Sequence, residues 1–275
     1  MDTSSQDPLF LLAQQSNSDI NLATGALSIA KIAYPKLDIA AYLEKLDDMA
    51  AALKSQVTAS QPMTRLEELN RYFFGELGFK GNQTDYDDPR NSYLNEVIDR
   101  RLGIPITLSI VYLTLGGKLD LHLAGISFPM HFLVKCDIPQ GPFFIDPFME
   151  GIILKKTDLA ARLQQVQKDT TDLENFLEAA TAKQILARML RNLKQIYHHN
   201  RAFSQAIELG EKILWFQPEE SYDHRELGFL YYQTKDYHKS LQAFETCLLL
   251  ATNQREEEDA RRYIQTLANH LGALN

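Results

Sequence analysis

His131 and Asp146 are the two side chains whose types and spacing best fit catalysis. The histidine opens one predicted strand and the aspartate closes the next, so a hairpin would bring them together. An imidazole beside a carboxylate has its tautomer fixed and its charged form favoured. This pairing is typical of a Cys-His-Asp hydrolase or acyltransferase, in which a thiol is the attacking group. The sequence has two cysteines, Cys136 and Cys247.

Three predicted strands must position the pair, at residues 123–128, 131–136 and 142–146. If residues 137–141 form a five-residue loop, Cys136 lies opposite Pro142. His131 is then one step out of register with Asp146, and a single β-bulge would place both side chains on one face.

Predicted helices lie both before and after these three strands in the sequence. Pro105 begins an almost wholly apolar helix, ITLSIVYLTL, which we expect to be buried on most sides. Upstream, Asp38 is predicted to cap a helix, and Thr64 with Glu67 forms a capping box for another. Downstream, one helix is predicted from Thr157 to residue 167, and a further helical stretch covers residues 172–198.

A 34-residue pattern of large and small side chains follows, as in helix-turn-helix repeats. The first set is Leu193, Tyr197, Ala206 and Pro218, and the second is Leu227, Gly228, Tyr231, Ser240 and Phe244. Stacked repeats share one core, and a predicted helix over residues 255–271 would cap the array.

The composition is that of an ordinary globular protein. The chain has 275 residues and a formal net charge of −8, which argues against general binding to nucleic acid or acidic membranes. The start, MDTSSQDPLF, lacks the features of a signal peptide, and no apolar run reaches the length of a membrane span. Two cysteines suggest a reducing compartment, so we expect a cytoplasmic protein.

The runs NSYLNEVIDRRLGIPITLS, FPMHFLV and FIDPF, in this order, resemble the SirB-type transglutaminase-like proteins with C-terminal tetratricopeptide repeats. The resemblance covers roughly residues 60–270. It implies a mostly helical α+β fold: a papain-like core with a small antiparallel sheet, then an all-α repeat region. We expect residues 1–156 to form the core with its N-terminal helices, and residues 157–275 the linker helices and repeats.

In active relatives of the broader superfamily, the resemblance implies a cysteine at the start of the central helix, where the helix N-terminus favours the thiolate. His131 and Asp146 match the base and the residue that orients it. The helix start, from Gly103 to Thr107, holds no cysteine. This departure argues against thiol-based transglutaminase or protease activity.

Other nucleophiles fit poorly. Cys136 is an odd number of residues after His131 on the same strand and so points to the opposite face, and Cys247 falls at a packed position of the repeats. Thr107 and Ser109 lie near the helix start, but an unactivated hydroxyl is a weak nucleophile. The alternative is that His131 and Asp146 form a purely structural pair.

Four further residues are candidates for binding. Glu96 and Arg100 are placed for an ion pair on a helix face, either solvated or forming a polar shell beside the site. Arg188 and Arg191 belong to a partly basic stripe with Lys194 and His198, which is either a solvated face or a site for an acidic peptide. Adjacent histidines on a helix diverge, so His198 and His199 predict no metal site, and no cofactor is expected.

We therefore expect a non-catalytic transglutaminase-like protein, a pseudoenzyme that binds a protein or peptide in its repeat groove. The alternative is a hydrolase or acyltransferase that uses His131 and Asp146 with an unconventional nucleophile. A third hypothesis is a regulator of gene expression that acts through a protein partner. The sequence has no helix-turn-helix signature for direct contact with DNA.

Overall fold

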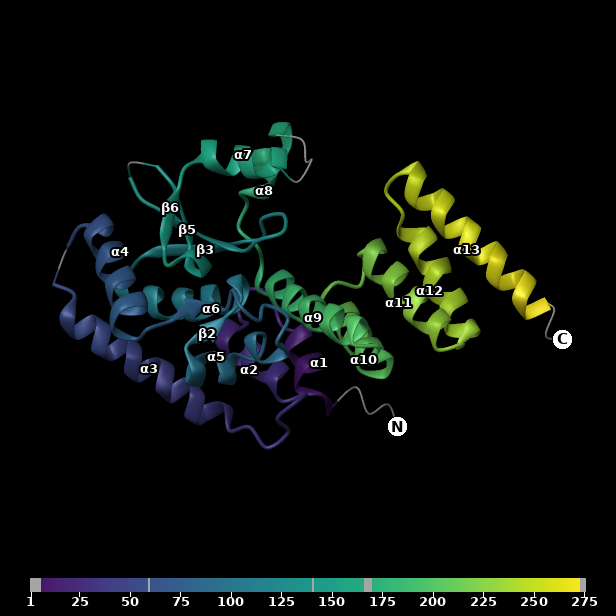
Figure 1. The fold of residues 1–275 in the computed structure, drawn as a ribbon, viewed down its shortest axis with the longest axis horizontal. Helices are drawn as coiled ribbons and strands as arrows, with labels where there is room; N and C mark the ends of the chain where they lie inside the picture. The colour runs from purple at the N-terminus through teal and green to yellow at the C-terminus, as the bar shows by residue number, and fades with distance from the viewer. Residues whose placement is uncertain (1–5, 59, 140, 166–169, 273–275) are drawn as a thin grey trace. The chain divides into compact units, whose positions relative to one another are not determined.

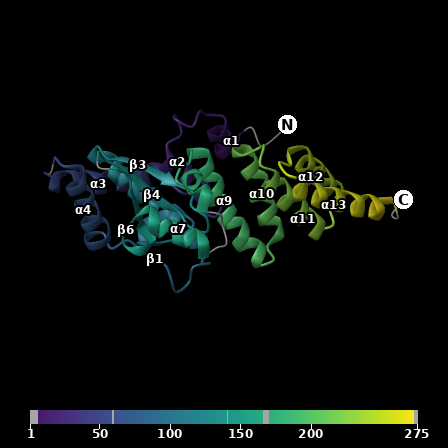
Figure 2. The same cartoon turned by 90° about the horizontal axis from the view of Figure 1, so that it is seen from above.

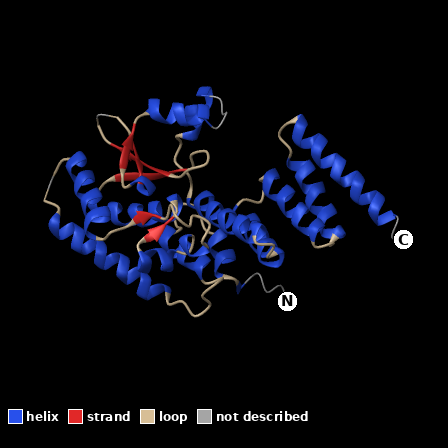
Figure 3. Ribbon diagram, viewed as in Figure 1, coloured by secondary structure: helices blue, strands red, loops and turns tan. Residues whose placement is uncertain are grey.

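The computed structural model describes residues 6–58, 60–139, 141–165 and 170–272. The chain divides into two compact units. The larger comprises Gln15–Met189, and the smaller comprises the described residues of Met1–Gln14 and Leu190–Asn275. Helices predominate in both units, and the strands all belong to the larger one (Figure 3).

The larger unit is built around one apolar helix, α6, which packs between α3 and the strands (Figure 1). Its side chains are buried almost all round, as the sequence predicts. Asp38 accepts a hydrogen bond from the Ala41 backbone N–H and so caps α3, as expected. The helices of this part are α2 (Leu22–Ala30), α3 (Ile39–Gln56), α4 (Pro62–Asn70), α5 (Leu94–Arg100) and α6 (Pro105–Gly116).

Four antiparallel strands form the main sheet, in the order β3-β4-β5-β6. They are β3 (His122–Ile126), β4 (Leu133–Asp137), β5 (Phe143–Asp146) and β6 (Ile152–Leu154). The predicted register is wrong by one residue, since Cys136 pairs with Phe143 rather than with Pro142. Asp137 still belongs to β4 and β5 begins at Phe143, so the connection starts one residue later than expected and has the same length. A second, two-stranded parallel pair joins β1 (Lys80–Gly81) to β2 (Leu102–Gly103).

The prediction that His131 opens a strand is wrong. His131 lies in a turn before β4, which begins at Leu133. The His131 backbone N–H donates to the Phe128 carbonyl over 3.1 Å, which closes a four-residue turn. Pro129 follows Phe128, and Met130 has a positive φ of 58°. A turn with this geometry cannot continue the ladder, so the pairing with β3 begins only at Leu133.

One face of the sheet is covered by α7 (Lys156–Gln165) and α8 (Leu173–Phe176). Their apolar side chains join a cluster made of Ile126, Phe128, Leu133, Phe144, Leu154, Leu159, Leu163 and Leu177. Residue 157, where the linker helices and repeats were expected to begin, therefore lies inside the larger unit. The helical stretch predicted over residues 172–198 is interrupted, because Ala180 donates its backbone N–H to Gly125 of β3.

The smaller unit has the predicted repeat architecture. Successive helices pack side by side (Figure 2): α10 (Phe203–Phe216), α11 (Ser221–Gln233), α12 (Tyr237–Leu250) and α13 (Gln254–Gly272). They follow α9 (Ala182–His199), and the boundary between the two units falls within α9, after Met189. Small residues accept large ones as expected. A Cβ at Gly228 would lie 2.9 Å from the Phe244 ring, and the Ser240 hydroxyl donates to the Gly228 carbonyl over 2.8 Å.

An N-terminal helix, α1 (Pro8–Ala13), also packs in the smaller unit, against α10. Lys212 forms an ion pair with Asp7, and the Phe10 and Trp215 rings meet edge to face at 5.5 Å. None of the helices in the described ranges is both long and apolar enough to cross a membrane.

Candidate functional site

The His131 imidazole and the Asp146 carboxylate are in direct contact, with Nε2 and Oδ1 2.8 Å apart. The carboxylate is fully buried (0% exposed) and ends β5. Its Oδ1 also accepts the backbone N–H groups of Phe148 and Met149, at 3.2 and 3.3 Å, and so caps a short 3₁₀ turn. The sequence therefore brings these two residues together even though the strand register differs.

Arg162 of α7 completes the surroundings of the carboxylate, with Nη1 3.1 Å from Asp146 Oδ2. Burial alone would raise the pKa of Asp146, but the hydrogen bonds from His131 and Arg162 outweigh it and lower that pKa. The carboxylate is therefore ionised at neutral pH and orients the imidazole. Among the described residues, nothing hydrogen-bonds to the other ring nitrogen, Nδ1.

Arg188, which the sequence suggested for peptide binding, holds the turn that carries His131. Its Nη2 donates to the His131 carbonyl over 2.6 Å, and both terminal nitrogens reach the Phe128 carbonyl at 3.1 Å. Nη1 also donates to the Ser127 hydroxyl. Four hydrogen bonds from one planar guanidinium fix the backbone on which the histidine stands.

An aromatic side chain, Phe148, lies beside the imidazole. The Phe148 and His131 ring centroids are 6.2 Å apart, and the Tyr86 ring meets Phe148 edge to face at 5.8 Å. Met130, in the histidine turn, is 83% exposed. The pair is thus at the edge of a partly apolar surface.

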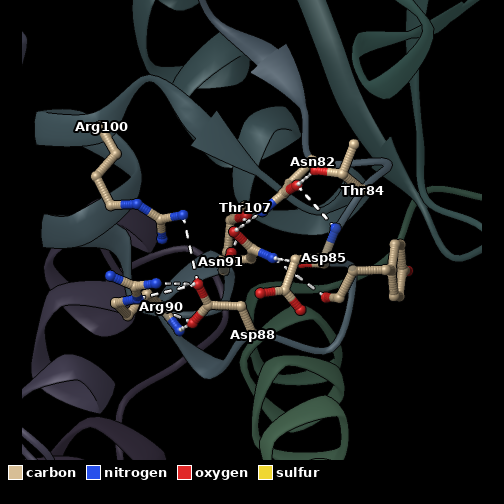
Figure 4. A network of polar contacts seen from close by, with 9 residues as sticks. Asn82, Thr84, Asp85, Asp88, Arg90, Asn91, Arg100 and Thr107 are labelled. Carbon is tan, nitrogen blue, oxygen red and sulfur yellow. Dashed lines mark hydrogen bonds and ion pairs between the residues drawn. The ribbon is translucent and has the colours of Figure 1, made fainter.

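A polar network around Asn91 fixes the segment that carries Tyr86, and Figure 4 shows Asn91 with Asn82 and Asp85. The Asn91 amide donates to the carbonyls of Asp85 and Tyr86, at 2.7 and 3.2 Å, and its oxygen accepts from the Asn82 amide at 3.1 Å. Asn91 is fully buried. Asn91 was not among the candidates from the sequence, and the glycine-, aspartate- and proline-rich segment around it, typical of ordered turns, is the signal that was missed.

Arg100 belongs to the same network. The helical spacing predicted an ion pair between Arg100 and Glu96, but Arg100 contacts Asp88 instead. Its Nη2 lies 3.5 Å from the Asp88 carboxylate, to which Arg90 also donates (Figure 4). Glu96 instead accepts from Tyr34, and burial together with this hydrogen bond raises the pKa of Tyr34 to about 12.

The two candidate hydroxyls are not bonded to His131. Thr107 Oγ1 donates to the Asn91 carbonyl over 2.7 Å and accepts the Ile104 backbone N–H at 3.1 Å, so it caps α6. Ser109 is fully buried, and its hydroxyl has no hydrogen-bond partner among the described residues. A nucleophile needs a base within hydrogen-bond reach, and neither hydroxyl has one.

We expect the two thiols to be inert in the native protein. Burial raises the pKa of Cys136 to about 11 and also raises that of Cys247. A protonated, buried thiol reacts slowly with alkylating agents. Iodoacetamide at pH 7.5 should therefore modify neither cysteine before unfolding, and both in denaturant, as read by mass spectrometry. Rapid native labelling of either thiol would contradict this account of the site.

Gly81 of β1 allows the 3₁₀ turn after Asp146 to approach closely. A Cβ at this position would lie 2.6 Å from the Phe148 carbonyl oxygen, which is backbone and cannot rotate away. We expect Gly81→Ala to destabilise the protein by about 1–3 kcal/mol, the usual cost of overpacking. Urea unfolding measures the loss.

Gly117→Ala is the matched control for this substitution. Its Cβ would have no neighbour within 4 Å, and its φ of −61° suits any residue. The control should unfold at the wild-type urea concentration or above it. Equal unfolding midpoints for both variants and the wild type would show that the close approach of Phe148 is unimportant.

Arg191 pairs within the smaller unit, with Nε 2.9 Å from Asp223 Oδ1. Of the nearby histidines, His198 contacts Gln233 at 3.2 Å, and His224 contacts the Pro218 carbonyl at 2.8 Å. Within the described residues, no three histidine, cysteine or acidic side chains gather as a metal site would require.

Comparison with known proteins gives two family matches that together span most of the chain. Residues 40–191 match the transglutaminase-like superfamily, and residues 193–268 match the tetratricopeptide repeat. The first match contains both His131 and Asp146, and the second contains α10, α11 and α12.

Relatives align over nearly the full length. A UPF0162 protein of Xylella fastidiosa (strain Temecula1) is 33% identical over 263 residues, which cover 94% of each chain. Protein SirB1 of Salmonella typhimurium is 26% identical, over 89% of this chain and 90% of that one. Among solved structures, a crystal structure of menin aligns with a TM-score of 0.41 and 12% identity, over 95% of this chain and 74% of that chain.

Proposed function

Because the chain belongs to the transglutaminase-like superfamily and continues into tetratricopeptide repeats, we propose that it is a non-catalytic module that binds a protein or peptide through those repeats. The observation that carries the proposal is the missing nucleophile. His131 is oriented by Asp146, but the hydroxyls of Thr107 and Ser109 are not bonded to it. The His131–Asp146 pair then either stabilises the turn before β4 or binds a ligand without converting it.

The repeat region supports the proposal because it contains a groove of about 480 Å³ between α9 and α11. Stacked helical repeats commonly bind extended or helical peptides on such a surface. The cysteines, Cys136 and Cys247, are free thiols, which fits a reducing compartment, and the proposal places the protein in the cytoplasm. A role in regulation through a bound partner is compatible with it.

The experiment is a peptide array probed with the full-length protein. Tyr232 lines the groove and is 43% exposed, so Tyr232→Arg should abolish selective binding, while His131→Ala should leave it intact. Leu249→Arg is the matched control, because Leu249 is exposed on α12, which contributes no groove residue. Selective peptides that bind Tyr232→Arg as well as wild type would refute the proposed groove.

A second candidate is favoured by one observation, the 2.8 Å contact that leaves the imidazole Nδ1 without a hydrogen-bond partner among the described residues. A base held in this way suits a hydrolase or acyltransferase. That function requires an unconventional nucleophile to reach Nδ1 after a rearrangement, and turnover by the intact protein is its test.

A further inference from the structure

The groove between α9 and α11 has features that indicate what it binds. Its volume of about 480 Å³ lies within the usual range of sites that bind small ligands. Among its lining residues are Lys194, His198, Glu226, Phe229, Leu230 and Tyr232. These belong to the two helices of the smaller unit that face each other across the groove.

Lys194 is the unusual member of this lining. Its side chain is only 5% exposed, yet its ammonium makes no hydrogen bond to the described part of the chain. The nearest carboxylate oxygen, Asp223 Oδ1, is 4.0 Å away, and both oxygens of that carboxylate already accept from Arg191. A buried donor without an acceptor is costly, so folding alone does not account for a lysine here.

Asp223 and Glu226 are each close to an arginine, which leaves the Lys194 ammonium without a hydrogen-bonded counterion. Asp223 neutralises Arg191, and Glu226 has its own cation, since Arg225 Nη2 lies 3.5 Å from Glu226 Oε1. Of the residues that line the groove, Lys194 is therefore a cation with no carboxylate within hydrogen-bond reach. A ligand group that carries a negative charge would complement it.

The rest of the groove suits an apolar group. The Leu230 side chain is buried, and the Phe229 ring is held by edge-to-face contacts with Phe244 and Tyr263, at 5.1 and 4.8 Å. Tyr232 is left half open at the rim. A bulky aliphatic or aromatic side chain would gain by covering this surface.

We propose that the groove binds a peptide segment of a partner protein in which an acidic side chain lies beside a bulky apolar one, and that the acidic side chain bonds to Lys194. The inference rests on the proposed function and narrows it to one class of ligand. Lysine has a flexible stem and three donors, so a small rotation of the side chain brings its ammonium to the incoming carboxylate. The apolar neighbour covers Leu230 and Tyr232.

The test uses the full-length protein and an array of end-blocked dodecapeptides in matched pairs. In one member of each pair every Asp and Glu is replaced with Asn and Gln. Peptides selected by wild type are then titrated by fluorescence anisotropy against wild type, Lys194→Met and Lys239→Met. The last removes a lysine from α12, no residue of which lines the groove.

We expect wild type to bind the acidic member about 10- to 100-fold more tightly, as for loss of a charged hydrogen bond. Lys194→Met should bind both members alike, and Lys239→Met should keep the difference. Lys194→Met should melt at the wild-type temperature or higher, because it removes an unbonded buried ammonium. Misfolding would therefore not explain why this variant loses the preference for the acidic peptide.

Two results overturn the inference. Wild type that binds both members of each pair equally, or Lys194→Met that keeps the preference, would exclude a carboxylate at Lys194 while leaving peptide binding in the groove standing. Failure of wild type to select any peptide would instead refute the proposed function, and the inference would fail with it.

Discussion

Asp223→Ala is expected to destabilise the smaller unit by about 3–5 kcal/mol, the usual cost of removing one partner from a buried ion pair. Asp223 is buried on α11 and binds the Arg191 guanidinium through both of its oxygens. Without it, Arg191 and Lys194 remain on neighbouring turns of α9 as like charges with no carboxylate between them. Urea unfolding followed by circular dichroism measures the loss.

Two variants separate the buried pair from a general effect of charge. Asp259→Ala removes a carboxylate from the largely exposed pair with Arg262 on α13, and should change stability by less than about 1 kcal/mol. Adding Lys194→Met to Asp223→Ala should recover part of the lost stability, because one of the two uncompensated cations is gone. Equal losses from Asp223→Ala and Asp259→Ala would contradict the described burial.

Asp146→Asn is expected to cost about 3–5 kcal/mol at pH 7, again through loss of a buried charge with its partners in place. The carboxylate serves His131, Arg162 and two backbone N–H groups at once. An amide can accept at its one oxygen, but its NH₂ faces other donors.

The cost should depend on pH in a defined direction. The folded pKa of Asp146 lies below its ordinary value, so its contribution is complete above the unfolded pKa of about 3.9 and is lost as pH falls through the folded value. The stability difference between wild type and Asp146→Asn should therefore shrink from pH 7 to pH 3. A difference that is constant or grows in acid would show that the ionised carboxylate does not stabilise the fold.

Local rules of helix formation made much of the architecture predictable. The cap at Asp38, the buried helix after Pro105 and the repeat set around Gly228 each depend on near neighbours in sequence or on a fixed period, and the structure has all three. His131 and Asp146 were also found, because each lies at the edge of a strand-like run.

The features that were missed depend on contacts between distant segments. Arg188 was assigned to a solvated or peptide-binding face because its bonds to the histidine turn, some 57 residues away, leave no periodic signal. Ala180 interrupts a helical pattern because it donates its backbone N–H to Gly125. Asn91 ends a short 3₁₀ turn and is buried where its amide donates to the carbonyls of Asp85 and Tyr86. Tertiary pairing overrides local propensity at such positions.

The most direct test of the central claim is turnover by the intact protein. Wild type and His131→Ala would be incubated with a glutamine-containing peptide, with and without a fluorescent primary amine, and amide hydrolysis and amine incorporation followed by mass spectrometry. We predict no difference between the two proteins, because no nucleophile among the described residues is bonded to the imidazole. Turnover by wild type that is lost in folded His131→Ala would contradict the account and would show that His131 belongs to a catalytic site.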